Sequence, residues 1–132
     1  MSIWDDLEKI DLQESQNLEE MSRVGFVDTY EIYVNTDDPG NIPHFHIRDS
    51  ATRGNNFHTC IKICSNEYFH HTGKEDVLRK KDLKKLCKFL SDNSGDDEFK
   101  TNWNVLIFMW NRNNSKMKVD KTQPMPDYTN IK

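Results

Sequence analysis

Two short stretches, PHFHI at residues 43–47 and FHTCIKIC at residues 57–64, decide the fold because polar and apolar side chains alternate in both. Successive side chains of a β-strand point to opposite faces of the sheet. Phe45 and Ile47 therefore share one face of the first stretch, as the two isoleucines do in the second. A register slip of one residue would move a whole apolar set into water. We therefore predict that the stretches pair in one antiparallel sheet, with their apolar residues facing the same core.

This register gathers chemically active side chains on the other face of the sheet, namely His44, His46, His58 and Cys60. Tyr33 joins them if its apolar neighbours point to the core. Two histidines at positions i and i+2 of a strand reach one metal ion, and imidazole with thiolate suits Zn²⁺. Histidine also suits proton transfer near neutral pH. The pattern leaves three interpretations open: a structural polar face, a metal site, or a face for acid–base chemistry or nucleic-acid contact.

The remaining pattern predicts an α+β fold, a small antiparallel sheet of three to four strands packed on two C-terminal helices. The segments at 28–35 and 68–71 are the other expected strands of a sheet that spans residues 26–71. Leucines spaced by three and four residues predict a helix near 78–92. The apolar run at 105–110 suits a strand or a helix, and we favour a helix over 101–113 that Thr101 caps. The expected core is Ile32, Val34, Phe45, Ile47, Ile61, Ile63, Leu83, Leu86, Leu90, Leu106 and Trp110.

The length of 132 residues fits one domain, which we place at residues 23–114. Residues 1–22 are strongly acidic and are expected to form a mobile arm or a short helix that docks elsewhere. Residues 115–132 contain two prolines and are expected to form an extended C-terminal tail. The abundance of asparagine is typical of AT-rich genes and suggests a Bacteroidetes-like or phage-like source.

Composition narrows the class of protein further. No apolar run approaches the ~18 residues of a transmembrane helix, and residues 1–6 lack the features of a secretory signal. Three cysteines form an odd number, which favours reduced thiols and a cytoplasmic location over a disulfide framework. We therefore expect no contact with membranes.

A stripe of cations follows the second face of the first expected helix, and we call it the lysine stripe: Lys81, Lys84, Lys85 and Lys88. Solvated helix faces often carry such charges, and the stripe also suits contact with a polyanion or an acidic partner. The net charge of −4 argues against strong nucleic-acid binding by the whole chain. The acidic arm is a candidate to screen the stripe.

The PHFHI stretch, after a strand segment and an Asp-rich turn, resembles a family of small bacterial proteins of unknown function marked by an Asn-Asp-His-x-Pro-Pro-His-Phe-His-Val type motif. The resemblance covers residues 28–114 and includes a helix that ends in Trp110-Asn111. It implies a small α+β protein of the kind encoded on mobile elements or phages beside helix-turn-helix regulators, and hence toxin–antitoxin-like by gene neighbourhood. This chain lacks the family's first histidine and its double proline, so a metal site here must recruit His58, Cys60 or an aspartate.

We therefore expect a non-enzymatic cytoplasmic interaction module with a protein partner, such as half of a toxin–antitoxin-like pair. The alternative is a metal- or His-dependent hydrolase, nuclease-like in its chemistry, that uses His44, His46 and His58. Whether the chain is an enzyme stays open, no cofactor is expected by default, and Zn²⁺ is the metal that the donor set would accept. Nucleic-acid contact through the lysine stripe is a third, weaker expectation.

Overall fold

The computed structural model describes residues 22–35, 42–49, 57–70 and 75–132. The predicted acidic arm falls almost wholly outside these residues, as does the Asp-rich turn after residue 35. The predictions for these segments therefore stay predictions.

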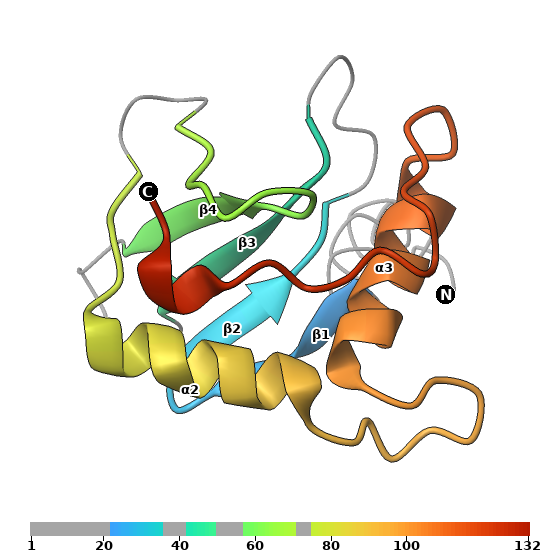
Figure 1. The fold of residues 1–132 in the computed structure, drawn as a ribbon, viewed down its shortest axis with the longest axis horizontal. Coiled ribbons are helices and arrows are strands. Elements are labelled where there is room, and N and C mark those ends of the chain that lie inside the picture. Colours follow the sequence, from blue (N-terminus) through green and yellow to red (C-terminus); the bar gives the residue numbers. More distant parts are fainter. Residues whose placement is uncertain (1–21, 36–41, 50–56, 71–74) are drawn as a thin grey trace, which may run out of the picture.

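The centre of the fold is one antiparallel sheet with the strand order β1-β2-β3-β4 (Figure 1). Its strands are β1 (Arg23–Val27), β2 (Tyr30–Tyr33), β3 (His44–Asp49) and β4 (His58–Lys62). Phe45 lies opposite Ile61 and His46 lies opposite Cys60 across the β3–β4 pair. The predicted α+β class and the predicted register of the two alternating stretches are confirmed.

Two of the expected strands, at residues 28–35 and 68–71, differ from the structure. The segment at 28–35 was predicted as one strand, but its first two residues form the turn between β1 and β2. Asp28 there has a φ of 54°, a left-handed conformation that Asp tolerates better than most side chains. The segment at 68–71, predicted as another strand, contributes a single bridge from Tyr68 to Ile61. The four strands thus include β1 instead of that segment.

Both predicted helices are present, as α2 (Lys80–Ser91) and α3 (Asn102–Asn113). Thr101 caps α3 because its side chain accepts a hydrogen bond from the Asn104 backbone N–H, while the Asn104 side chain accepts one from the Thr101 N–H. This reciprocal cap explains why the apolar run at 105–110 forms a helix. Neither helix is long and apolar enough to cross a membrane, and the same holds throughout the part of the chain that the structure describes.

The core lies between the sheet and the two helices, and every residue of the expected core is buried. The segment after residue 115 also contributes to it, which the expected extended tail did not indicate. It runs back along α3 and ends in the short helix η1 (Tyr128–Asn130) beside α2 (Figure 1). The Tyr128 ring packs on Phe45, and its hydroxyl donates to the Lys62 carbonyl at 2.6 Å. The C-terminal segment therefore fastens the helical layer to β4.

Candidate metal centre

The pairing of β3 with β4 brings the predicted histidine face together. His46 is the direct partner of Cys60, while His44 and His58 lie diagonally from this pair on the same face. The alternation that buries Phe45 and Ile47 against the helices turns all four side chains to the other side of the sheet. Tyr33 joins them from β2, where it lies opposite His46.

Three donor atoms of this face converge to a small triangle. His46 Nδ1 lies 3.0 Å from His58 Nε2 and 3.3 Å from Cys60 Sγ, and the third side, from Cys60 Sγ to His58 Nε2, measures 3.8 Å. Zinc bonds of about 2.05 Å to nitrogen and about 2.3 Å to sulfur separate tetrahedral ligands by about 3.3–3.6 Å. The triangle therefore has the dimensions of one face of a zinc coordination tetrahedron.

His44 stands next to this triangle as a fourth donor. One ligand atom each of His44, His46 and Cys60 lies within 4.8 Å of the others. His44 Nδ1 lies 2.7 Å from the Ile42 carbonyl, to which it donates its proton. This bond places the imidazole lone pair on Nε2, the arrangement typical of a metal-bound histidine. His46 and Cys60 thus belong to two overlapping groups of three donors, one completed by His58 and the other by His44.

Asn35 contacts His46 through Nε2, the ring nitrogen that is not part of the donor triangle. Its Nδ2 lies 3.2 Å from His46 Nε2 and donates to it, so that His46 Nδ1–H donates to His58. Rotation of the Asn35 amide by 180° would let its oxygen accept from His46 Nε2–H and leave the Nδ1 lone pair for a metal. The same neighbour thus serves both protonation patterns of His46.

Aromatic packing fixes the orientation of the rings. Tyr33 stacks on His46 with centroids 5.0 Å apart, and His58 stacks on His46 with centroids 5.2 Å apart. His44 contacts Phe69 and Trp110 at centroid distances of 4.8 Å and 5.6 Å. Rings held on several sides lose little further freedom when they bind an ion, which favours binding.

Burial decides which chemistry this face supports. The exposed fractions of His44, His46 and Cys60 are 0%, 3% and 0%. An alternative role is nucleophilic catalysis, because Cys60 contacts His46 and His46 contacts Asn35. A catalytic thiol, its base and an orienting amide are arranged in the same way. A substrate has no access to a fully buried sulfur, however, whereas a bare ion needs only the space between the donors. The geometry therefore favours a closed metal site over a nucleophilic one.

A charged cluster around the buried Glu31 borders the site, and it was not among the expected site residues. Glu31 of β2 lies between two guanidinium groups, with its oxygens 2.6 Å from Nε of Arg23 and 2.6 Å from Nε of Arg48. Arg48 also lies over the Tyr33 ring, 4.7 Å from its centroid. Glu31 and Tyr33 are two residues apart on β2 and therefore share a face of the sheet. This spacing could have placed Glu31 next to the histidine face from the sequence alone. Arg48 of this cluster packs on Tyr33, which in turn stacks on His46.

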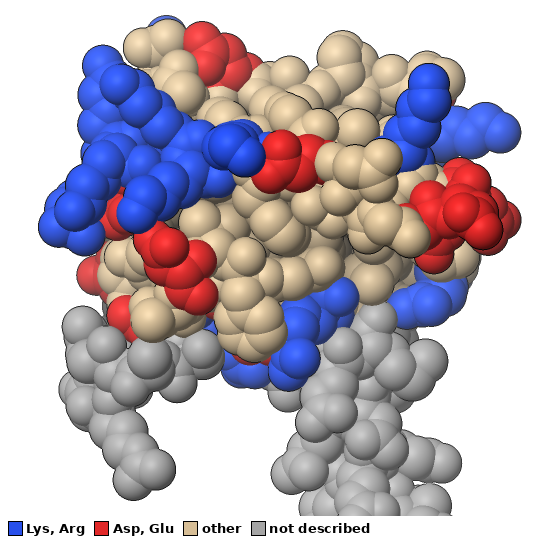
Figure 2. Space-filling model, turned by 90° about the horizontal axis from the view of Figure 1, so that it is seen from below, with Lys and Arg blue, Asp and Glu red and all other residues tan. Residues whose placement is uncertain are grey.

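The lysine stripe lies away from this site. Its four lysines are exposed on α2, as predicted, and Figure 2 shows Lys and Arg side chains gathered over this helix at one end of the molecule. Lys85 pairs with Asp28 at 2.8 Å and Lys88 with Asp92 at 3.2 Å, so acidic neighbours partly neutralise the stripe. The structure therefore does not bring the stripe and the histidine face into one site.

Among the residues that the structure describes, the other cysteines and His70 do not belong to the group of donors that could hold a metal. Cys64 is exposed and Cys87 is half-buried, and burial raises the pKa of both thiols, which disfavours thiolate at neutral pH. His70 is exposed, and His71 lies outside the described residues.

Comparison of the chain with protein-family models, with curated proteins and with solved structures finds no match.

Proposed function

We propose that this chain is a transition-metal-binding interaction module whose sheet holds Zn²⁺ through His46, His58 and Cys60, with His44 as the fourth ligand. The single observation that supports this proposal most is the donor triangle with sides of 3.0, 3.3 and 3.8 Å. Those distances suit hydrogen bonds without an ion and suit ligation with one. The Ile42 carbonyl supplies the outer contact that a metal-bound His44 requires, and the Asn35 amide supplies one for His46 once it is rotated by 180°.

The ligand set favours a structural ion over a hydrolytic one. Structural zinc sites are closed by four protein ligands, whereas catalytic sites keep a position for water or substrate. Ligation by all four side chains, His44, His46, His58 and Cys60, would leave no such position. The ion would tie β3 to β4, and so would stabilise a small domain whose outer surfaces contact a partner. The proposed function thus keeps the interaction module from the first prediction. It takes the metal site, without hydrolysis, from the alternative prediction.

The first test measures metal in the full chain purified without tag or chelator. We expect near-stoichiometric zinc by elemental analysis, and thiolate-to-metal charge-transfer absorption after substitution with Co²⁺. Cys60→Ser and His46→Ala should each lose the metal and the absorption band. His70→Ala is the matched control because His70 is an exposed histidine outside the site, and this variant should keep both.

The stability of the protein gives an independent measurement. Because the ion binds the folded state, a hundredfold excess over Kd raises the free energy of unfolding by about 2.7 kcal/mol. Removing the ion with a chelator should lower Tm in the wild-type chain but not in Cys60→Ser. A chain that binds no transition metal, or that binds it equally after Cys60→Ser, would refute the metal site. Metal with turnover of a phosphodiester substrate would restore the hydrolase alternative.

A further inference from the structure

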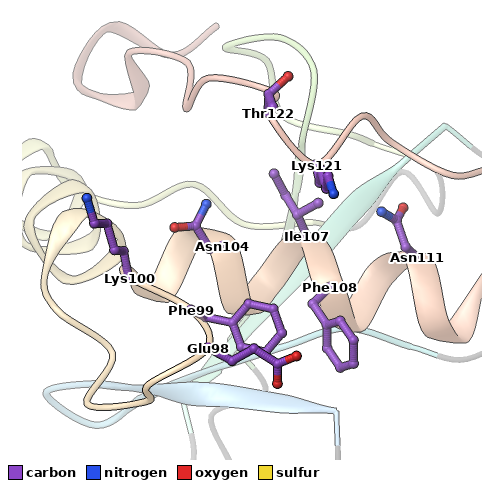
Figure 3. A pocket seen from close by; sticks show the side chains of 9 residues that line it. All are labelled: Glu98, Phe99, Lys100, Asn104, Ile107, Phe108, Asn111, Lys121 and Thr122. Carbon is purple, nitrogen blue, oxygen red and sulfur yellow. The ribbon is translucent and has the colours of Figure 1, made fainter.

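A second site lies on the other side of α3, in a cavity of about 530 Å³ (Figure 3). Its volume falls within the range of small-molecule sites. One face of α3, the loop before it and the C-terminal segment form its walls. The lining residues are Glu98, Phe99, Lys100, Asn104, Ile107, Phe108, Asn111, Lys121 and Thr122. None of these residues belongs to the metal centre.

The walls of this cavity are fixed before any ligand binds. Trp103 Nε1 donates to the Gln123 carbonyl at 2.7 Å, next to the lining residue Thr122. The Asn111 side chain accepts from the Val119 N–H at 2.7 Å and donates to the Val119 carbonyl at 2.8 Å. These bonds hold the C-terminal segment at a set distance from α3. A ligand would therefore bind without first ordering the chain, which lowers the entropic cost of binding.

Two phenyl rings form the apolar margin of the cavity. The rings of Phe99 and Phe108 lie 4.8 Å apart at an angle of 42°. Phe108 is 42% exposed, whereas its neighbour Ile107 in the cavity wall is 1% exposed. An exposed aromatic surface against a buried aliphatic one suits a flat ring, because aromatic rings gain from offset or edge contacts beyond the burial of area.

Two ammonium groups belong to the lining, at separate places. Figure 3 shows Lys121 on the side of Ile107 away from the two phenyl rings, and Lys100 at another end of the lining, beyond Asn104. Both lysines are exposed, and neither forms an ion pair with an acid of the described segments. Glu98 is the single acid among the described residues of the lining, so these residues carry a surplus of one positive charge. An anion on the Lys121 side of the cavity would meet a favourable charge there, and Lys100 adds to the positive potential of the lining.

From these features we infer that the cavity binds a small aromatic carboxylate, with its ring against Phe99 and Phe108 and its carboxylate toward Lys121, where the positive charge of Lys100 adds to the attraction. The separation of the apolar margin from Lys121 selects a molecule with one apolar end and one anionic end. This binding site is independent of the proposed metal centre, because it uses other elements and other side chains. It gives the interaction module a ligand of defined chemistry.

The test compares two isosteric probes on the full-length chain by calorimetry and chemical-shift mapping. 1-Naphthoate should bind saturably with shifts centred on Phe99 and Phe108, and neutral 1-naphthamide should bind at least tenfold more weakly. Lys100→Met/Lys121→Met keeps the side-chain length and removes both charges, so it should weaken naphthoate binding at least tenfold without changing naphthamide binding. Phe108→Ala should weaken both probes.

The matched control is Lys81→Met/Lys84→Met, which removes the same charge from α2. Naphthoate binding should be unchanged in this variant, because both lysines lie outside the cavity. The inference would be overturned by absent saturation with naphthoate, by equal affinity for the two probes, or by equal losses in the cavity and control variants. Thermal unfolding of each variant separates lost binding from lost folding, and the exposed positions of the lysines and of Phe108 favour folded variants.

Discussion

At residue scale, Gly25 marks a close approach of the sheet to α2. A Cβ atom at this position would lie 2.6 Å from Cζ and 2.9 Å from Cε1 of Phe89. Gly25 also lies where the β1–β2 register shifts, so the backbone there has little freedom to withdraw. The glycine is therefore required for the packing of Phe89 on β1.

We expect Gly25→Ala to lower the free energy of unfolding by about 1–3 kcal/mol, the usual cost of overpacking. Denaturant unfolding measures this loss. Phe89→Leu removes the clashing ring tip, so the double variant should be more stable than the sum of the two single losses predicts. Strictly additive losses would show that the close approach to Phe89 is not the cause.

At the scale of elements, the cap of α3 connects local sequence to both proposed sites. Trp110 of this helix contacts His44 at one end, and Asn104 near the other end lines the cavity. The Thr101 hydroxyl satisfies the Asn104 N–H at 3.2 Å, a backbone donor that the helix itself leaves without a partner. Correct initiation of α3 therefore positions residues of two separate sites.

Replacement of the capping residue tests this connection. Thr101→Ala should cost about 1 kcal/mol in the free energy of unfolding, whereas Thr101→Ser keeps the hydroxyl and should cost much less. Urea titration of the three chains provides the comparison. Equal stability of the alanine and serine variants would contradict a role for the hydroxyl as a cap.

At the scale of the whole molecule, Tyr128 joins the C-terminal segment to the core. Burial raises the pKa of its hydroxyl far above the ordinary value, with smaller contributions from Cys87 and Cys64. The unfolded chain releases this proton near pH 10, while the folded chain keeps it. The stabilisation is thus complete below pH 10 and is lost as pH rises, because the unfolded state binds fewer protons there.

We predict that the free energy of unfolding falls between pH 10 and 11, by up to about 1.4 kcal/mol per pH unit from this one group. Tyr128→Phe removes the ionisable group and the bond to the Lys62 carbonyl. It should therefore be less stable than wild type at pH 8 but should show a smaller loss between pH 10 and 11. Chemical denaturation at several pH values measures both effects, and an unchanged slope in the variant would argue against this assignment.

Local sequence predicted those parts of the fold that depend on short-range periodicity. Alternation in PHFHI and FHTCIKIC determined that His46 and Cys60 share one face, because a slip of one residue would expose Phe45 and Ile61. A slip of two residues would keep the faces, so the direct pairing of His46 with Cys60 came from the tertiary structure. Leucine spacing predicted α2, and Thr101 indicated where α3 begins. In each case the required information lies within a few residues along the chain.

Only the tertiary structure decided which distant segments meet. β1 and the packing of the C-terminal segment were missed because their stability comes from long-range contacts, such as that of Tyr128 with Phe45. The cavity beside Phe108 likewise combines three segments that no local pattern connects. The sequence by itself determined that the histidines and Cys60 share one face. Their burial, which favours a closed metal site, was decided by the packing of Tyr33, Phe69 and Trp110 around them, because exposure depends on everything that surrounds a side chain.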